Sequence, residues 1–424
     1  MLPGRTMTWQ KLRHQRDVVR NKDHTIIDRI AAAGKALEAG EPGARSQLVD
    51  LGRALMLGAE LPSEFIQRSL WAEPALAGIC RIFVETKAFQ HLAGAGDAGL
   101  SSADLAARTG IEQKLLERFL RHLSAMCLLA PVGGAANTWR GTELSNQLAE
   151  HKYDRSLEFC YDVGGPSFAA WPAFFKKNGY RTPASATEGP LNFAHATDLP
   201  FFAFLSATPS HLANFSAFMT AYRAGHPEWH QADFYPVAER LMAGYDAAVS
   251  DVLLVDVGGS VGHDLVAFAA HFPDHPGRLV LQDREPVIES IQGGGDDGPA
   301  RRPFEATVHD FFTPQPVRAA RAYYLHSVLH DWDDVQGVRI LENLRPAMRA
   351  GYSRLLLCEI VLTQERPALA ATNMDIQMLA YLGGDVHERT EAEWRGMLAQ
   401  AGFKVTQIYS FPGSAESIIE AEVA

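Results

Sequence analysis

The sequence predicts an α/β protein in which a mostly parallel β-sheet, covered by helices on both faces, follows an all-helical N-terminal region. From Asp251 onward, short apolar runs alternate with helical patterns, which is typical of a parallel sheet with covered faces. Before that point, apolar residues recur mainly at helical spacing, as in residues 26–40. The 424 residues exceed the roughly 100–200 residues of a usual domain, so we expect at least two domains.

We place the first domain at residues 1–155 and the second at residues 156–424, with residues 156–245 forming a helical segment around the substrate. The stretches 26–40 and 46–61 each carry one apolar helical face. Such a face has to be buried, either against a partner subunit or against the rest of the chain.

Residues 99–150 have the pattern of a winged helix, with two helices joined by a short turn and then two strands around the turn PVGGAANT. Such a module either recognises DNA, here through Lys114, Arg118 and Arg121, or serves only in packing. The chain has a net charge of -11, with 50 acidic against 39 basic residues, which favours packing. We therefore expect no nucleic-acid partner.

The composition also predicts the cellular compartment. No apolar run approaches the roughly 20 residues that a membrane-spanning helix needs, so we expect no membrane partner. The first residues, MLPGRTMTWQKLRHQRDVVRNK, are too charged for a secretory signal. The four cysteines are scattered and form no CxxC pair, as in reduced intracellular proteins. The sequence thus predicts a cytoplasmic protein.

The predicted sheet begins with five strands separated by connecting segments that are mostly helical. These strands are residues 251–257, 278–283, 304–310, 320–329 and 353–362. Residues 403–410 and 417–424 are expected to close the chain as an antiparallel hairpin at one edge. Residues 177–200 have loop composition. The aromatic helices of residues 201–223 follow, and their Phe215, Phe218 and Met219 either line a substrate pocket or pack in the core.

A glycine turn follows the first strand of the sheet. Gly258, Gly259 and Gly262 allow the backbone to approach a ligand closely, and their spacing departs from the dinucleotide pattern G-x-G-x-x-G. With Asp256 in front, the spacing D-x-G-x-x-x-G suits S-adenosylmethionine, which carries no phosphate. Asp283 ends the next strand, where a carboxylate can bind both ribose hydroxyls. The third strand ends in a further acid, Asp310.

The stretch YLHSVLHDWDD, residues 324–334, carries ionisable groups at the end of the fourth strand. His326 and His330 are four residues apart, but in a strand-to-loop segment this spacing does not indicate a metal pair, and we expect no metal. The imidazole of His330 has an unperturbed pKa near 6.5, which suits a general base, although a structural role stays open. Trp332 either stacks on an adenine ring or fills the core.

Two glutamates belong to the same edge of the sheet. Glu359 is expected at the end of the fifth strand, and Glu388 precedes the helix of residues 390–403. A carboxylate that binds an imidazole fixes its tautomer and stabilises its cation. One glutamate is expected in that role and the other in positioning substrate, whereas surface or helix-capping acids are the alternative.

With these motifs the chain resembles the caffeic-acid-type small-molecule O-methyltransferases, most closely the fungal natural-product members. The matching pieces are VDVGGSVGH, LQDREPVI, HDFF, LHSVLHDWDD, LLLCEIVL and NMDIQMLAYLGGDVHERTEAEWRGMLAQAGF. The resemblance implies a Rossmann-like class I methyltransferase sheet, an N-terminal winged-helix dimerisation domain and a homodimer.

The resemblance also assigns the site residues. It implies S-adenosylmethionine as cofactor, with S-adenosylhomocysteine as product. It places the methionine end near Gly258 and Gly259, the ribose on Asp283, and the adenine by Asp310, Phe311 and Trp332. It implies His330 as general base, flanked by Glu359 and Glu388. In the segment DIQMLAYL, Met378 and Leu382 correspond to the substrate pocket.

Two residues depart from the family pattern. His326 stands where many members have Lys or Arg, in a cofactor contact, and Ser260 replaces a common glycine. We predict an O-methyltransferase that acts on a phenolic or enolic small molecule, such as a polyketide, by direct in-line transfer. A pericyclase or dehydratase of the same fold, and a winged-helix regulator, remain as alternatives.

Overall fold

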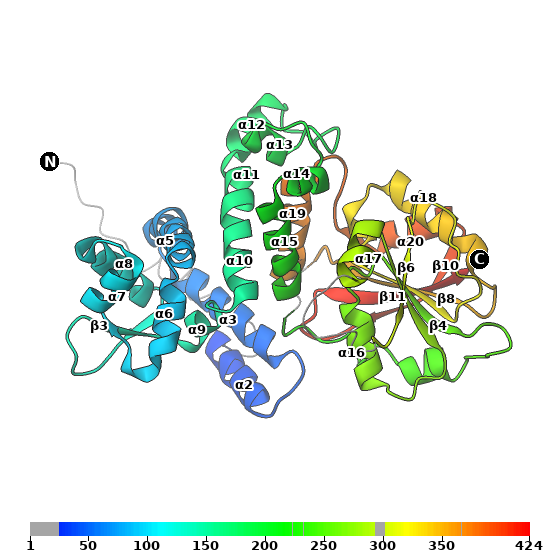
Figure 1. Cartoon of the computed structure of the whole chain (residues 1–424), viewed down its shortest axis with the longest axis horizontal. Helices are drawn as coiled ribbons and strands as arrows, with labels where there is room; N and C mark the ends of the chain where they lie inside the picture. The colour runs from blue at the N-terminus through cyan, green and yellow to red at the C-terminus, as the bar shows by residue number, and fades with distance from the viewer. Residues whose placement is uncertain (1–24, 223, 232, 293–301, 366) are drawn as a thin grey trace. The chain divides into compact units, whose positions relative to one another are not determined.

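The computed structural model describes residues 25–424 except 223, 232, 293–301 and 366 (Figure 1). The chain forms two compact units. The first contains the residues up to Ala169 together with Phe202–Ala224, and the second contains Ala170–Phe201 and Gly225–Ala424. The expected domain boundary at residue 155 lies within helix α10 (His151–Phe159) of the first unit.

The first unit begins with helices whose ends are set by local hydrogen bonds. Thr25 caps the first described helix through a reciprocal pair of bonds with Asp28. The helices are α2 (Ile26–Glu38), α3 (Ala44–Ala59), α4 (Pro62–Gln67), α5 (Glu73–Glu85) and α6 (Ala88–Ala95).

The winged-helix pattern of residues 99–150 is present as expected. Helices α7 (Ser102–Thr109) and α8 (Gln113–Ala125) meet at Gly110, which adopts a left-handed conformation. Strands β1 (Leu100–Ser101), β2 (Leu129–Pro131) and β3 (Thr138–Gly141) form a small antiparallel sheet with β3 in the middle. The fully buried face of α8, formed by Leu116, Leu120 and Leu123, holds this module together.

Helix α10 packs along α15 (Pro209–Tyr222) in the same unit. The ring of Phe159 lies 5.3 Å from the ring of Phe215 and 5.5 Å from that of Phe218, measured between centroids. The aromatic side chains of α15 thus contribute to the packing of the first unit. Its remaining helices are α9 (Glu143–Gln147), α11 (Gly165–Ala169) and most of α14 (Phe201–Ala207).

The second unit contains the predicted sheet, in the order β10-β11-β8-β7-β4-β5-β6, with the short β9 paired to β8. Strand β11 runs antiparallel to both of its neighbours, β8 and β10, and β10 and β11 form the expected edge hairpin. The strands are β4 (Val252–Val257), β5 (Arg278–Asp283), β6 (Glu305–Val308), β7 (Ala322–His326), β8 (Arg354–Leu362), β9 (Arg389–Thr390), β10 (Phe403–Ser410) and β11 (Glu416–Val423).

Helices cover both faces of this sheet, each over its own apolar core. Helices α16 (His263–His271) and α17 (Glu285–Gln292) pack on the face that carries Leu254, Leu281 and Cys358. Helices α18 (Asp334–Leu344) and α20 (Glu391–Gln400) pack on the other face, against Leu355 and Leu357. The alternation of strand side chains between the two faces explains the nearly continuous apolar strand sequences.

Two local expectations were wrong. Residues 177–200 include the helix α13 (Pro190–His195), which starts at a proline and is capped when Asn192 accepts the N–H of Gly189. The predicted strand 320–329 ends at His326, because Ser327 has a φ of 50° and Leu329–Asp331 form a 3₁₀ turn. Among the described helices, none combines the length and apolarity that a bilayer crossing requires.

The glycine turn after β4 leads to our first prediction. Gly262 has a φ of 84°, and a Cβ atom there would lie 2.5 Å from the ring of Phe304. Gly262→Ala should therefore destabilise the protein by about 1–3 kcal/mol, through overpacking and a strained backbone. Chemical denaturation measures the change.

Gly396 in α20 provides the matched control, because a Cβ atom there would meet no atom within 4 Å. Gly396→Ala should raise stability by roughly 0.5–1 kcal/mol, as expected inside a helix. Equal effects of the two substitutions would contradict the packing that we assign to the turn.

Candidate active site

The glycine turn at the carboxyl end of β4 packs closely on the side chain of Asp256. The carboxyl group of Asp256 is fully buried, and a Cβ atom on Gly259 would lie 2.3 Å from it. Gly258 has a φ of 78°, and a Cβ atom there would lie 3.0 Å from Val328. The turn can therefore follow this path only with glycine at these positions.

Asp283 joins the ends of β4 and β5. Its two carboxylate oxygens accept the backbone N–H of Ser260 at 2.8 Å and that of Arg284 at 2.7 Å. Ser260, the residue that departs from the family glycine, adopts a left-handed conformation with a φ of 54°. Burial raises the pKa of Asp283, although both N–H groups oppose this effect. The carboxylate is thus fixed beside the turn.

An aromatic cluster lies next to the same turn. The ring of Phe311 is within 3.7 Å of the Cβ position of Gly258 and stands edge-to-face with Trp332, with 5.9 Å between ring centroids. Asp310 precedes this cluster and accepts the N–H of Phe312 at 2.9 Å. The structure therefore brings together the glycine turn and the aromatic residues that the sequence predicted for one ligand.

This arrangement fits S-adenosylmethionine. Glycines without a Cβ leave the backbone N–H groups approachable, Asp283 offers carboxylate oxygens for hydroxyl groups, and the aromatic faces suit a purine. None of these groups is specific for a phosphate, in agreement with a ligand that carries none.

His330 lies in the 3₁₀ turn after β7 and is buried beside Glu388. Its Nδ1 is 2.8 Å from Oε1 of Glu388, and the side chain of Glu388 is completely buried. Burial alone would lower the pKa of His330, but Asp331, Glu388 and Glu359 raise it to about 10. The neighbouring carboxylates therefore favour the protonated form of the imidazole.

Glu359 acts on the backbone that leads to His330. Its Oε1 accepts the N–H groups of Val328 at 3.1 Å and Leu329 at 2.8 Å. Side-chain ligand atoms of His330, Glu359 and Glu388 lie within 4.8 Å of one another. Burial raises the pKa of Glu359 to about 7, against the opposing charge of His330. Glu388 thus hydrogen-bonds the imidazole, whereas Glu359 fixes the turn before it.

Sequence reasoning missed two residues of this site. Asp331 places Oδ1 3.5 Å from Nε2 of His330, and burial raises its pKa to about 6. Arg389 is fully buried and donates to the carbonyls of Leu329 and Trp332, at 3.0 and 2.7 Å. Asp331 was visible as the neighbour of His330, but no sequence signal distinguishes a buried arginine from an exposed one.

His326 and His330 have different hydrogen-bond partners. Its Nδ1 lies 2.9 Å from Oδ2 of Asp264, and its Nε2 lies 3.2 Å from Oε1 of Glu416. Both ring nitrogens are thus engaged by carboxylates.

The expected substrate residues belong to two units. Met378 and Leu382 are buried at the end of α19 (Leu369–Tyr381) in the second unit, where Tyr381 stacks on Phe201 with 5.4 Å between centroids. Met219 lies on α15 in the first unit, as do Phe215 and Phe218, whose rings pack against that of Phe159.

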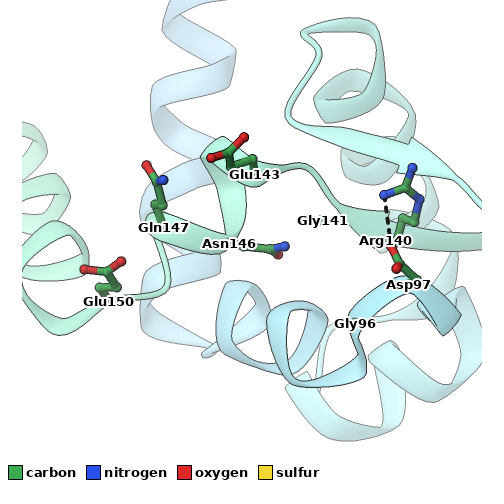
Figure 2. A pocket seen from close by; sticks show the side chains of 8 residues that line it. All are labelled: Gly96, Asp97, Arg140, Gly141, Glu143, Asn146, Gln147 and Glu150. Atoms are coloured by element: carbon green, nitrogen blue, oxygen red, sulfur yellow. Dashed lines mark hydrogen bonds and ion pairs between the residues drawn. The ribbon is translucent and has the colours of Figure 1, made fainter.

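A polar hollow of about 560 Å³ lies in the first unit (Figure 2). The residues that line it are Gly96, Asp97, Arg140, Gly141, Glu143, Asn146, Gln147 and Glu150. Its one basic side chain, Arg140, is 3.4 Å from Asp97. Small-molecule sites are mostly apolar, so this acidic and open hollow does not resemble one.

Comparisons with known proteins show the family of this chain. Residues 228–404 match the model of the O-methyltransferase domain family. The chain is 51% identical over 401 residues to O-methyltransferase mpaG' of Penicillium brevicompactum, covering 94% of this chain and 98% of that protein.

Solved structures resemble the whole chain. LepI in complex with SAH and a substrate analogue is 25% identical, with a TM-score of 0.82 over 94% of this chain and 100% of that one. A structure described as a pericyclic reaction enzyme shares the fold at 24% identity, with a TM-score of 0.83 over 93% of this chain and 98% of that one.

The hydrogen bond between His330 and Glu388 leads to a prediction that does not depend on activity. Glu388→Gln keeps the size of the side chain but removes a charge that raises the pKa of His330. The pKa of His330 should therefore fall, and His330 should lose its proton at a lower pH than in the wild type. An NMR titration of the His330 ring measures this pKa. Glu391→Gln, on the exposed first turn of α20, is the control and should leave it unchanged.

Proposed function

This chain belongs to the O-methyltransferase family, and from that premise we propose that it methylates a phenolic or enolic hydroxyl of a small natural product with His330 as general base. The general activity is that of an S-adenosylmethionine-dependent O-methyltransferase. The observation that carries the finer proposal is the buried pair of His330 and Glu388, held beside the glycine turn.

We assign the cofactor to the groups around that turn. Gly258 and Gly259 would receive the methionine end, Asp283 the ribose hydroxyls, and Phe311 and Trp332 the adenine ring. When bound, S-adenosylmethionine supplies an electrophilic methyl group on a positively charged sulfur. The side chains of this chain hold the reactants in attack geometry, which is the largest contribution we assign to the protein.

The proton of the acceptor hydroxyl goes to His330. Glu388 accepts the Nδ1–H, so that Nε2 is the nitrogen that takes a proton. A phenol has a pKa near 10, so its neutral form is a poor nucleophile at pH 7. The carboxylates raise the pKa of His330 towards that of the phenol. His330 therefore acts as a base only after it has lost its own proton.

Glu359 and Arg389 would act as positioning residues. They bind the backbone on either side of His330, at Val328, Leu329 and Trp332. Met378 and Leu382, buried in the second unit, are our candidates for apolar contacts with the acceptor. Phe215, Phe218 and Met219 stay candidates from the first unit, where the two phenylalanines also pack on Phe159.

A pericyclase or dehydratase is the second candidate, because a pericyclic reaction enzyme shares this fold. The 51% identity to an O-methyltransferase and the buried base favour methyl transfer. A winged-helix regulator would use the exposed Lys114, Arg118 and Arg121 of α8. Incubation with methyl-labelled S-adenosylmethionine and a panel of phenols separates these functions, because only a methyltransferase labels the acceptor.

We also propose a homodimer through the N-terminal helices. Leu70 and Trp71 are 67% and 68% exposed, and the same region exposes Ile27, Val49, Met56, Leu57, Phe65 and Ile66. Large exposed apolar side chains that gather in one region are typical of an interface between subunits.

The dimer proposal predicts a concentration-dependent mass. Analytical ultracentrifugation should give twice the chain mass for the wild type at micromolar concentration. A double variant, Leu70→Glu with Trp71→Glu, should shift the protein towards the monomer, because charges are costly in a buried interface. Val335→Glu is the control, since Val335 is 74% exposed in the second unit. A wild type that sediments as a monomer would remove the proposal.

Two substitutions separate chemistry from cofactor binding. His330→Ala should lower kcat by roughly 10²–10⁴-fold, as for loss of a general base, with little effect on cofactor affinity. Asp283→Ala should weaken cofactor binding by roughly 1.5–3 kcal/mol for each charge-assisted hydrogen bond lost. Calorimetry measures binding and turnover assays measure kcat.

The pH dependence provides the internal check on His330. In the wild type, kcat/KM should rise with pH as His330 loses its proton in the free enzyme. The deficit of His330→Ala should shrink at high pH, where the phenol ionises without help. Near-normal turnover of this variant at neutral pH would mean that His330 is not the base.

A further inference from the structure

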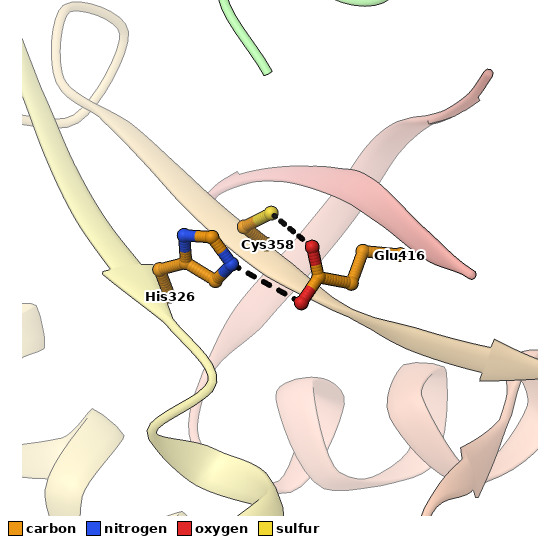
Figure 3. Close-up of side chains that lie close together, drawn as sticks. All are labelled: His326, Cys358 and Glu416. Carbon is orange, nitrogen blue, oxygen red and sulfur yellow. Dashed lines mark hydrogen bonds and ion pairs between the residues drawn. The ribbon is translucent and has the colours of Figure 1, made fainter. Parts of the chain in front are cut away.

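A second buried cluster lies on the same sheet, apart from the residues that we assign to catalysis. It consists of His326 at the end of β7, Cys358 in β8 and Glu416 at the start of β11 (Figure 3). One ligand atom from each side chain lies within 4.8 Å of those of the other two. The proposed methyl transfer assigns no chemical step to these side chains.

The register of the sheet brings the three side chains to one face. His326 pairs directly with Cys358 in the parallel ladder of β7 and β8. Cys358 pairs with Ile418 in β11, and Glu416 lies two residues before Ile418, on the same side of that strand. Three strands thus present an imidazole, a thiol and a carboxylate to a single point.

Two of the separations within the cluster are close to those between the ligands of a tetrahedral zinc ion. Bonds of about 2.0–2.3 Å to nitrogen, oxygen and sulfur place neighbouring ligands roughly 3.3–3.8 Å apart. Nε2 of His326 lies 3.2 Å from Oε1 of Glu416, and Sγ of Cys358 lies 3.9 Å from Oε2. Only small side-chain movements are needed for all three to bind the same ion.

The surroundings of His326 also match a metal ligand. Its Nδ1 lies 2.9 Å from Oδ2 of Asp264, which leaves Nε2 directed at the cluster. Histidines that bind a metal almost always give their other ring nitrogen to a carboxylate or carbonyl, which fixes the tautomer. The side chains of His326, Asp264 and Glu416 are 8%, 5% and 10% exposed, so the cluster is largely shielded from solvent.

An ion-pair network without metal is the competing explanation. In that network the positive charge of a protonated His326 is balanced by the carboxylates of Asp264 and Glu416, without a metal ion. That network has no need of Cys358, which is buried and whose Sγ lies 3.9 Å from Oε2 of Glu416. Thiolate, imidazole and carboxylate together form a ligand set typical of zinc sites.

We propose that His326, Cys358 and Glu416 form a binding site for a divalent metal ion, best matched to zinc(II), with Asp264 orienting His326. This departs from the sequence-based expectation of no metal. On binding, His326 and Cys358 each release a proton to solvent, and the carboxylate of Glu416 becomes a ligand. The ion would tie β7, β8 and β11 together and, through Asp264, hold α16 behind the glycine turn.

Metal titration of the purified full chain tests the proposal without any activity assay. After dialysis against a chelator, the wild type should bind one zinc ion per chain in competition with a chromophoric chelator. Zinc should also raise the Tm, because only the folded chain contains the assembled site. Cobalt(II) in place of zinc should give a thiolate charge-transfer band in the near ultraviolet.

Variants identify the ligands. Cys358→Ser should abolish the cobalt band and the zinc-induced rise in Tm. Cys80→Ser is the matched control, because Cys80 is also a buried free cysteine but lies in the first unit. Asp264→Asn should weaken zinc binding by roughly 10–100-fold, as expected for a residue that orients a ligand.

The cluster of His330, Glu359 and Glu388 provides the second control. Its side-chain ligand atoms also lie within 4.8 Å of one another, so it is the other candidate site for a metal ion among the described residues. His330→Ala should keep the cobalt band and the zinc affinity. If Cys358→Ser does not fold, as judged by circular dichroism, Glu416→Gln takes its place in the same comparison. A wild type that binds no zinc, or zinc binding that is lost with His330→Ala and kept in Cys358→Ser, would overturn the proposal.

Discussion

The reversal of strand order at β4 is the constraint on which the candidate site depends. The chain runs outward from β4 to β5 and β6, and then returns to place β7 on the other side of β4. Connections on either side of such a point leave in opposite directions, and ligands bind in the crevice between them. The glycine turn follows β4 and the turn of His330 follows β7, so the reversal brings the two together. The contact distance of 3.0 Å between the Cβ position of Gly258 and Val328 shows how closely they approach.

The adjacent residues Cys358 and Glu359 of β8 belong to different buried clusters, one on each face of the sheet. Successive side chains of a strand point to opposite sides. Cys358 therefore meets His326 and Glu416 on the face covered by α16, whereas Glu359 meets the turn of His330. A single strand thus supports two buried imidazole clusters, one on each face of the sheet. A change in the register of β8 would disrupt both.

Burial of the charged groups around His330 is tolerated because these groups pair with one another or with the backbone. His330 faces Glu388 and Asp331, and the fully buried Arg389 binds two carbonyls and Asp334. An unpaired charge in such a place costs several kcal/mol, whereas a paired one is held in a fixed orientation. In the site of His330 this orientation serves the proposed proton transfer. It also sets the pKa of the base, which Asp331 and Glu388 raise against the effect of burial.

The sequence by itself determined the sheet, its edge hairpin, the winged-helix pattern and the glycine turn. These features depend on local patterns, namely alternating apolar runs and glycines where the backbone needs a positive φ. The end of β7, the helix α13 and the separate tasks of Glu359 and Glu388 were decided by tertiary structure. So were the roles of Arg389 and the cluster around His326, whose partners lie 62 and 90 residues away in the chain. Local patterns contain no information on which distant side chain will meet a buried group, because only the packing of the strands sets that distance.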